Sequence, residues 1–567
     1  MTSIFAAESS RSFERVWALR GSTGDGRRAT TVGRSERAER APGVTHRVRR
    51  VALIAVCALA ACSTPTPNPA PQPGQAGRAR DSQPPALDAI TESDIRRDIF
   101  ALGGDAMRGR EAGTLDEMRA TGWVAERARE AGLAPAGDDG TYFQWWSIRR
   151  TRLSENSRIA IGQATLRLWT DVVALNNQSA MLDVPIVYVA DSAELSRTDV
   201  KGKAVAIPLA AITVQPDAQF TIRGNFQNTT ATAARQRAAM VAQAGGSAAI
   251  IVSDAAASLD HAFEATAAVS RRGTYGIDSA GAPAGAFAGG GGRGRGNAAP
   301  QVPSLWVRHD KLDLLRAPGA RLSINVFSET FSYPSGNVIG VVKGTDPRLA
   351  NEYVLYSGHQ DHDGVRYPVN GDSIWNGADD NATVSVALLA TARAFVKHPA
   401  PRPVLFVWHG AEERGLLGSR WYSSHPTVPR SQIVAVLNAD MIGRNNPDSA
   451  ALLGVQPPHK NSVALVDAAL SANALLTHFV IDSSWDRPTH TEGWYFRSDH
   501  LPYARLGIPA IEFSTNLHPD YHTPRDEPSR IDLTKLTKMT KWMYATGWIV
   551  ANAAQRPDVI PGFKLER

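Results

Sequence analysis

Five apolar runs in the C-terminal half constrain the fold of this 567-residue chain more than any other feature. Each run is short, rich in β-branched and aromatic residues, and apolar at consecutive rather than alternate positions. Strands of this kind are buried on both faces, and the stretches between them are long enough for helices. The sequence therefore predicts an α/β fold, a three-layer sandwich with helices on both faces of a mixed, mostly parallel sheet. The runs are 338–342, 353–356, 404–408, 433–437 and 508–513.

Side chains that can bind metal follow four of these runs. Because ligands of open α/β sheets bind beyond the carboxyl ends of the strands, side chains that follow different strands are expected to meet there. Histidine and carboxylate donors without cysteine favour zinc in a catalytic rather than a structural role. The residues concerned are His359, Glu412, Glu413, Asp440 and His522.

Together with Asn376-Gly377-Ala378-Asp379-Asp380-Asn381, these motifs resemble, in content and order, the di-zinc aminopeptidase and glutamate carboxypeptidase family of metallopeptidases. The resemblance covers most of 88–550 and implies a zinc exopeptidase-like fold, two Zn²⁺ ions and a peptide substrate. It also implies the metal ligands, which are His359 and Asp440 for one zinc, Glu413 and His522 for the other, and Asp380 as a bridge between the two.

The same resemblance implies roles for three residues that do not bind metal. Glu412 would be the general base, because Glu413, as a ligand, would be locked in its ionised form. Asp361, two residues after His359, would accept a hydrogen bond from the other ring nitrogen of that histidine. Tyr521 would donate a hydrogen bond to the oxyanion of the tetrahedral intermediate.

Several neighbours have the same side chains and are interpreted differently. Asp379 is chemically equivalent to Asp380, and only the Asp-Asn pairing of the family favours Asp380 as the bridge. His362 competes with His359, but the His-x-Asp pattern of the family makes His362 an outer or solvent-facing residue. The histidines that are not expected to be ligands are His409, His500 and His518.

Positive charge is concentrated at the N-terminus. Residues 1–62 hold 11 arginines against five acidic residues, an excess equal to the net charge of +6 of the entire chain. The remainder is formally neutral, which argues against a nucleic-acid partner.

An apolar run at 51–62 follows Arg47-Val48-Arg49-Arg50 and is too short to be a permanent membrane span. Its end, Leu59-Ala60-Ala61-Cys62, resembles a bacterial lipobox. We therefore expect cleavage before Cys62 and lipidation of its thiol, which would anchor an exported protein to the bacterial cell envelope; an ordinary secretory signal is the alternative. A translation start near Val44 or Val48 would explain the residues that precede this signal. Both cysteines of the chain lie in this run, which excludes a cysteine nucleophile in the mature protein.

The composition changes along the chain predict five segments. Thr91 opens a capping-box pattern for one helix, and a second helix at about 115–131 ends at Gly132. The Gly-rich stretch 273–299 is interpreted as a mobile loop. The segments are an upstream extension with the signal peptide (1–62), a Pro-rich tether (63–87), the N-terminal part of the peptidase domain (88–182), an insert that resembles a β-rich protease-associated domain (183–325), and the main part of the peptidase domain (326–556).

The resulting hypothesis is a zinc-dependent exopeptidase. We favour an aminopeptidase, because carboxylates near the metals, such as Glu412 and Asp440, can receive a substrate ammonium group. A glutamate-type carboxypeptidase or a dipeptidase is the alternative, with Arg444 as a candidate for binding a substrate carboxylate or for a structural role. Two hypotheses from other classes are a glutaminyl-cyclase-like transferase with one zinc and a binding protein without catalysis, and the complete set of ligands argues against both.

Overall fold

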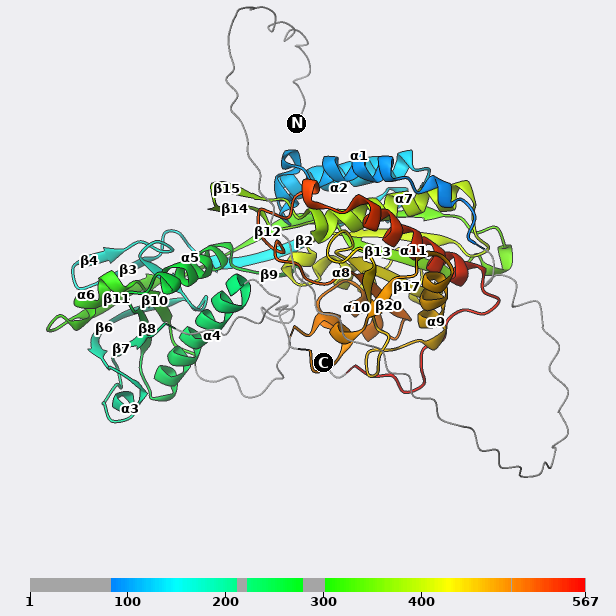
Figure 1. Ribbon diagram of the computed structural model, residues 1–567. Coiled ribbons are helices and arrows are strands. Elements are labelled where there is room, and N and C mark those ends of the chain that lie inside the picture. Colours follow the sequence, from blue (N-terminus) through cyan, green and yellow to red (C-terminus); the bar gives the residue numbers. More distant parts are fainter. Residues whose placement is uncertain (1–82, 212–221, 279–300, 491, 566–567) are drawn as a thin grey trace, which may run out of the picture. The chain divides into compact units, whose positions relative to one another are not determined.

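The computed structural model describes residues 83–211, 222–278, 301–490 and 492–565 (Figure 1). The predicted signal, the lipid anchor at Cys62, nearly all of the tether and most of the Gly-rich stretch lie outside these residues. Within them, no helix combines the length and the apolar character needed to cross a membrane.

In the described part of the chain, the larger of two main sheets has ten strands. The order across it is β19 (Val480–Asp482), β18 (Ser449–Leu453), β20 (Ala510–Ser514), β17 (Ile433–Asp440), β13 (Tyr353–His359), β16 (Val404–His409), β12 (Ser328–Val342), β2 (Phe143–Leu153) and β9 (Thr274–Ile277), with β1 (Ala134–Pro135) beside β12. The sheet is mixed, as predicted. Its four central strands, from β20 to β16, are parallel, and antiparallel pairs flank them on both sides.

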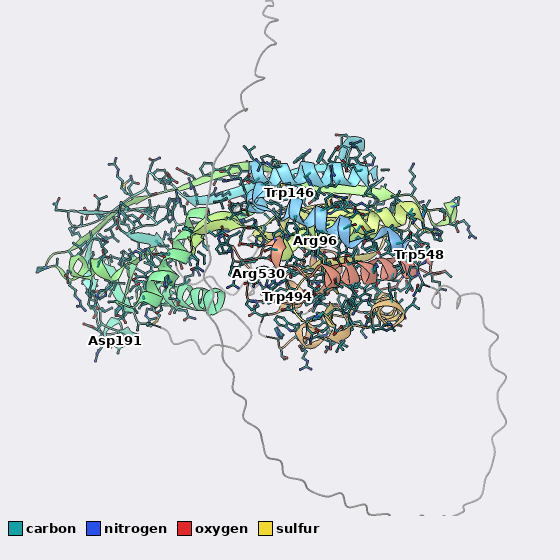
Figure 2. The ribbon with its side chains drawn as sticks, turned by 45° about the horizontal axis from the view of Figure 1, so that its top comes forward. Arg96, Trp146, Asp191, Trp494, Arg530 and Trp548 are labelled. Atoms are coloured by element: carbon teal, nitrogen blue, oxygen red, sulfur yellow. The ribbon has the colours of Figure 1, made fainter. Side chains whose placement is uncertain are left out.

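Helices cover both faces of this sheet and give the predicted three layers (Figure 1). One face carries α1 (Glu92–Leu102), α2 (Leu115–Glu130), α7 (Thr383–Lys397), α9 (Val463–Ala472) and α11 (Leu533–Asn552), and the other carries α8 (Leu417–Ser424) and α10 (His500–Arg505). Along β13, Val354 and Tyr356 pack into the first layer, whereas Leu355 packs into the second. Trp548 of α11, labelled in Figure 2, contacts Phe395 of α7 with ring centroids 6.2 Å apart.

The two N-terminal helices confirm the predicted start and stop signals. The backbone N–H of Asp94 donates to the side chain of Thr91 over 3.1 Å, which caps the first turn of α1. The helix α2 is followed by Gly132 at a φ of +89°, a conformation that a glycine adopts without steric cost.

Eight strands form the second sheet. Their order is β4 (Ala164–Leu166), β3 (Arg158–Ile161), β11 (Arg321–Val326), β6 (Ala180–Tyr188), β7 (Ala204–Leu209), β8 (Ala248–Ser253), β10 (Ser304–Val307) and β5 (Val172–Ala174). Along β7, Val205 and Ile207 face α4 (Ile222–Gln243) and α5 (Ala257–Arg272), and Ala206 faces the layer of α6 (Leu312–Arg316). The short helix α3 (Ser192–Leu195) follows β6, and β14 (Gly364–Val369) pairs with β15 (Asp372–Trp375) as a separate hairpin.

The strand pairing differs from the predicted segments in two places. The second sheet already begins at Arg158, so the boundary predicted at 183 falls too late for it. Residues Thr274–Ile277 form β9 of the larger sheet, with Thr274 opposite Thr151, so the interpretation of 273–299 as loop is wrong at its start. Both differences have one cause. The strand that a short strand pairs with depends on the tertiary structure, and it cannot be predicted from local composition. That the insert is a protease-associated domain stays a prediction.

Candidate metal centre

The central parallel strands bring the predicted residues to one edge of the larger sheet. His359 is the last residue of β13 and Asp440 is the last residue of β17. Glu412 and Glu413 lie in a short turn of helix after β16, and Asp380 lies in the segment Ala378–Ala382 before α7. His359, Asp380, Glu412 and Asp440 are buried, whereas Glu413 and His522, which lies in the loop after β20, are partly exposed.

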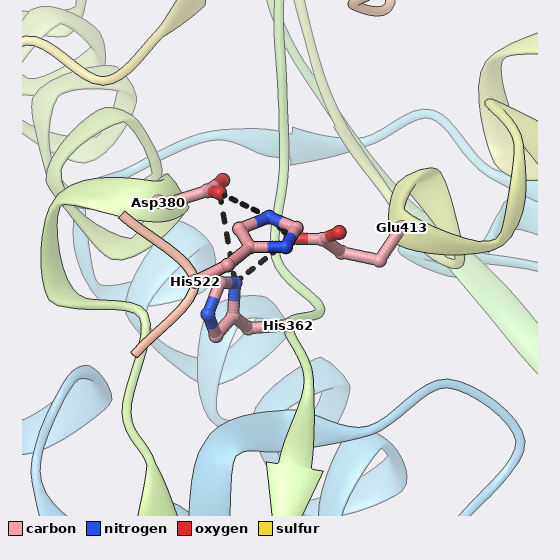
Figure 3. Close-up of side chains that lie close together, drawn as sticks. All are labelled: His362, Asp380, Glu413 and His522. Atoms are coloured by element: carbon pink, nitrogen blue, oxygen red, sulfur yellow. Dashed lines mark hydrogen bonds and ion pairs between the residues drawn. The ribbon is translucent and has the colours of Figure 1, made fainter. Parts of the chain in front are cut away.

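These residues form two groups of possible ligands. In each group, one donor atom from every residue lies within 4.8 Å of the others. The first group is His359, Glu412 and Asp440, and the second is His362, Asp380, Glu413 and His522 (Figure 3).

Asp380 connects the two groups through its two carboxylate oxygens. Oδ1 lies 3.3 Å from Nε2 of His359, and Oδ2 lies 3.0 Å from Nε2 of His522. The backbone N–H of Asp380 donates to Asp526, which holds the loop in this position. The carboxylate of Asp379 points elsewhere and accepts a hydrogen bond from the backbone N–H of Gly443 over 2.7 Å. A carboxylate that bridges two metals needs the geometry of Asp380 and not that of Asp379.

Zinc ions fit the donor atoms of this site. Nε2 of His359, both ring nitrogens of His362 and Oε1 of Glu413 are buried and make no well-aligned hydrogen bond among the described residues, although Nδ1 of His362 lies close to Oε1 of Glu413 and Nε2 of His359 lies close to Asp380. Leaving such groups unpaired costs free energy unless they are bound to metal. Imidazole nitrogens and carboxylate oxygens in groups of three or four are the donors that zinc takes.

The adjacent residues Glu412 and Glu413 have opposite electrostatic environments. Burial raises the pKa of Glu412 well above its usual value, although His359 counteracts part of this effect. Burial also acts on Glu413, but His522 and His362 outweigh it and hold its pKa well below the usual value. Glu413 is therefore ionised, as a ligand must be, and Glu412 is suited to take up a proton.

Asp361 has a different contact from the predicted one. Nδ1 of His359 lies 3.1 Å from the backbone carbonyl oxygen of Asp361 and 3.7 Å from its carboxylate. The carboxylate instead accepts hydrogen bonds from the backbone N–H groups of Glu412 and Glu413, over 2.9 and 3.3 Å. The prediction that the carboxylate of Asp361 orients His359 is therefore wrong, since the adjacent carbonyl lies nearer and the side chain holds the Glu pair.

His362 is not solvent-facing. Its side chain is fully buried, and Nδ1 lies 2.8 Å from Oε1 of Glu413 (Figure 3). The chain turns after β13, so the direction of His362 is set by the loop, and the His-x-Asp pattern on which the prediction depended does not report that direction. His409, His500 and His518 lie outside both groups, and His518 contacts the carboxylate of Asp379 at 3.3 Å.

Tyr521 stacks beside the second group. Its ring centroid lies 3.9 Å from that of His522, and its hydroxyl accepts a hydrogen bond from Arg497 over 2.9 Å. The guanidinium of Arg497 also lies over the ring of Trp494, at 4.7 Å from the centroid; Figure 2 labels this tryptophan. The contact between Arg497 and Tyr521 was not predicted from the sequence, because the two residues lie on different segments before and after β20.

Arg110 is a second residue whose role was not predicted from the sequence. It is fully buried and donates to the carbonyl oxygens of Gln360, Asn376 and Gly377 over 2.7–2.8 Å. It therefore holds together the loops that carry His359 and Asp380. A single arginine far upstream carries no sequence signal for such a role.

Part of the chain is similar in sequence to known aminopeptidases. Leucine aminopeptidase 1 of Trichophyton rubrum is 28% identical over 252 residues, which is 42% of this chain and 64% of that protein. Aminopeptidase YwaD of Bacillus subtilis is 25% identical over 262 residues, or 45% of this chain and 52% of that protein. The chain thus matches less than two thirds of the length of each.

Two solved structures resemble larger parts of the chain. An aminopeptidase from Aneurinibacillus sp. strain AM-1 covers 85% of the chain, with a TM-score of 0.49 and 17% identity, and 98% of that structure is matched. BSAP, a zinc aminopeptidase from Bacillus subtilis, covers 84% with a TM-score of 0.49 and 18% identity, and 99% of it is matched. Residues 337–547, which contain every residue of both ligand groups, match the profile of Peptidase family M28.

Proposed function

We propose that this protein is a zinc-dependent aminopeptidase with two metal sites. The observation that carries the proposal is the position of Asp380, whose two oxygens face His359 on one side and His522 on the other. One zinc would be held by His359, Asp380 and Asp440, and the other by Asp380, Glu413 and His522, with His362 beside it. Two bound zinc ions would polarise the scissile carbonyl and make water acidic enough to be deprotonated near neutral pH.

Glu412 would transfer the proton. Its carboxylate takes a proton from the attacking water, whose oxygen forms a bond to the carbonyl carbon, and returns it to the nitrogen as the C–N bond breaks. The environment that raises its pKa stabilises the protonated form between these two steps. Asp361 would hold the backbone of the Glu pair during the transfer.

Tyr521 would assist at the carbonyl oxygen. Arg497 donates to the hydroxyl oxygen of Tyr521, so the hydroxyl proton is free to point toward the substrate. A donor aimed at the developing oxyanion lowers the barrier more than one aimed at the ground state.

Removal of N-terminal residues is favoured over removal of C-terminal ones. The curated relatives named above are aminopeptidases. Arg444, the candidate for a substrate carboxylate, donates to Asp520 over 2.6 Å and is therefore engaged elsewhere.

Mass spectrometry of a peptide mixture tests the proposal. The purified full chain, loaded with zinc, should shorten peptides stepwise from the N-terminus, and the chelator-stripped protein should not. Shortening from the C-terminus would move the protein to the carboxypeptidase alternative. No cleavage with two zinc ions bound would contradict the peptidase function.

We also propose that the protein is an exported lipoprotein, anchored at the cell envelope through Cys62. The basic stretch, the short apolar run and the lipobox-like end support this. Expression in a bacterial host, with and without Cys62→Ser, should place the protein in the detergent-soluble membrane fraction and the variant outside it. Equal partitioning of both would contradict the anchor.

A further inference from the structure

Asp363 lies directly behind the second ligand group. Its Oδ2 atom lies 3.3 Å from Nδ1 of His522, the ring nitrogen opposite the one that faces Asp380. The side chain of Asp363 is 2% exposed, and a carboxylate buried to this extent costs free energy unless it is paired with cations. A carboxylate on one ring nitrogen fixes the tautomer and the direction of the other nitrogen.

Three arginines from separate segments surround this carboxylate. Arg272 and Arg414 each donate to Oδ1 of Asp363 over 3.2 Å, and Arg366 forms an ion pair with Oδ2. Arg414 also pairs with Glu111 at 3.2 Å. The position of Asp363 is therefore set by its ion pairs as well as by its own loop.

Arg272 comes from the most distant segment. It is the last residue of α5, the helix that packs against the second sheet, and it directly precedes β9 of the larger sheet after Gly273. The backbone carbonyl oxygens of Arg272 and Arg271 accept hydrogen bonds from Arg150 of β2. The pairing of β9 with β2 thus holds the guanidinium of Arg272 against Asp363.

We propose that Asp363 is a positioning residue for the metal ligand His522, and that Arg272 extends this support from the end of α5 to the metal centre. The inference rests on the proposed zinc sites. It predicts that the zinc affinity of the second site depends on the contact between Asp363 and His522, and that the affinity of the site of His359 and Asp440 does not depend on this contact.

The arginine next to Arg272 provides a matched control. Arg271 has a side chain that is 65% exposed and pairs only loosely with Glu155, at 3.9 Å, whereas the side chain of Arg272 is 17% exposed. Loss of either guanidinium removes one positive charge from the same helix end, but only Arg272 contacts Asp363.

The test is zinc titration of the full chain against a chromophoric chelator, with zinc content measured by mass spectrometry after dialysis. Asp363→Asn should weaken one of the two zinc sites by roughly 10–100-fold and leave the other unchanged. Arg272→Gln should weaken the same site by about tenfold or less, Arg272→Lys should recover part of this loss, and Arg271→Gln should match the wild type. Nitrogen NMR of the labelled imidazoles, with His522→Gln used for assignment, should show the Nδ1–H tautomer of His522 in the wild type and its loss in Asp363→Asn.

Unchanged binding of both zinc ions by Asp363→Asn would overturn the proposal, and so would equal weakening of the two sites. Identical titrations for Arg272→Gln and Arg271→Gln would overturn the part assigned to Arg272. Because Arg272 lies at the edge of the network, its variants still test the proposal if Asp363→Asn does not fold. A wild-type chain that binds fewer than two zinc ions would instead contradict the proposed function, and that outcome appears before any variant is made.

Discussion

The two sheets of this protein have similar layered cores but differ in what they bury. Among the described residues of 154–326, which include the second sheet, no Asp, Glu, Lys, Arg or His side chain is buried. The larger sheet buries ionisable side chains at the carboxyl edge of its central strands, among them His359, Asp361, Asp380 and Asp440. Buried charge costs free energy unless it is paired or bound to metal. The core of the second sheet thus avoids this cost, whereas the larger sheet keeps a costly polar edge that suits a metal centre.

The largest expected effect is the loss of kcat/KM on substitution of Glu412 or Glu413, and the zinc content of the variants distinguishes these two adjacent residues. Glu412→Gln and Glu413→Gln should each lower kcat/KM by roughly 10²–10⁴-fold, because a base or a ligand is lost. Only Glu413→Gln should also lose zinc. Zinc content and peptidase assays of both variants check this, with the exposed Glu126→Gln as control. Loss of zinc in Glu412→Gln as well would make Glu412 a ligand, as its place in the first group allows.

A cavity in the second sheet should destabilise without affecting the metals. Ile251 of β8 is fully buried, and Ile251→Ala should reduce the free energy of unfolding by about 2–5 kcal/mol. Zinc content at low temperature should stay at the wild-type value, because no ionisable side chain is buried among the described residues of this sheet. Denaturant unfolding and metal analysis of one sample measure both quantities, and a parallel loss of zinc would show that the two sheets are not separable in this way.

The buried carboxyl of Glu117 should make stability depend on pH. Burial raises its pKa to about 8 from an ordinary 4.5, so from pH 4.5 to 8 it is protonated when folded and ionised when unfolded. The unfolded state then binds fewer protons, and stability falls as pH rises, by about 3 kcal/mol between pH 5 and 7.5. Glu117→Gln should remove this part of the slope. Urea unfolding of the wild type and of Glu117→Gln at pH 5 and 7.5 measures the change in the free energy of unfolding for each protein. An equal change in the two proteins would show that Glu117 ionises in the folded state.

His362 tests whether the second group has an additional metal ligand. If His362 binds zinc directly, His362→Ala should weaken the second site by more than the roughly 10–100-fold that the loss of an outer partner causes. The control is His425→Ala, since His425 is exposed and stacks on Trp421 away from both groups. Zinc titration distinguishes the outcomes, and a loss of only about 10–100-fold or less in His362→Ala would assign His362 the outer role predicted from the sequence.

The smallest expected effect is at a helix cap on the second sheet. The side chain of Asp191, labelled in Figure 2, accepts a hydrogen bond from the backbone N–H of Glu194 over 2.8 Å. Asp191→Ala should cost about 1 kcal/mol of stability and leave zinc affinity unchanged. Thermal unfolding with and without zinc measures it. A change in zinc affinity would contradict the separation of the two sheets.

Much of the fold follows from local pattern. The apolar runs became β12, β13, β16, β17 and β20, and the capping signal of Thr91 became the start of α1. The meeting of the metal-binding side chains that follow these strands was predicted as well, because parallel strands place their carboxyl ends at one edge of the sheet. The membership of β9 in the larger sheet was missed, since four residues beside a Gly-rich stretch carry too little pattern to identify their partner.

The sequence by itself determined which chemical groups are available and that they meet at one edge of a sheet. Tertiary structure alone decided how they point: His362 turns inward, Asp361 holds the Glu pair, and Asp363 meets Arg272 from the far end of α5. The physical reason is that periodicity reports burial along a strand, where backbone geometry repeats. Beyond the strand end each side chain follows the dihedral angles of its own loop, such as the φ of +49° at His522, and those angles are set by contacts with distant segments.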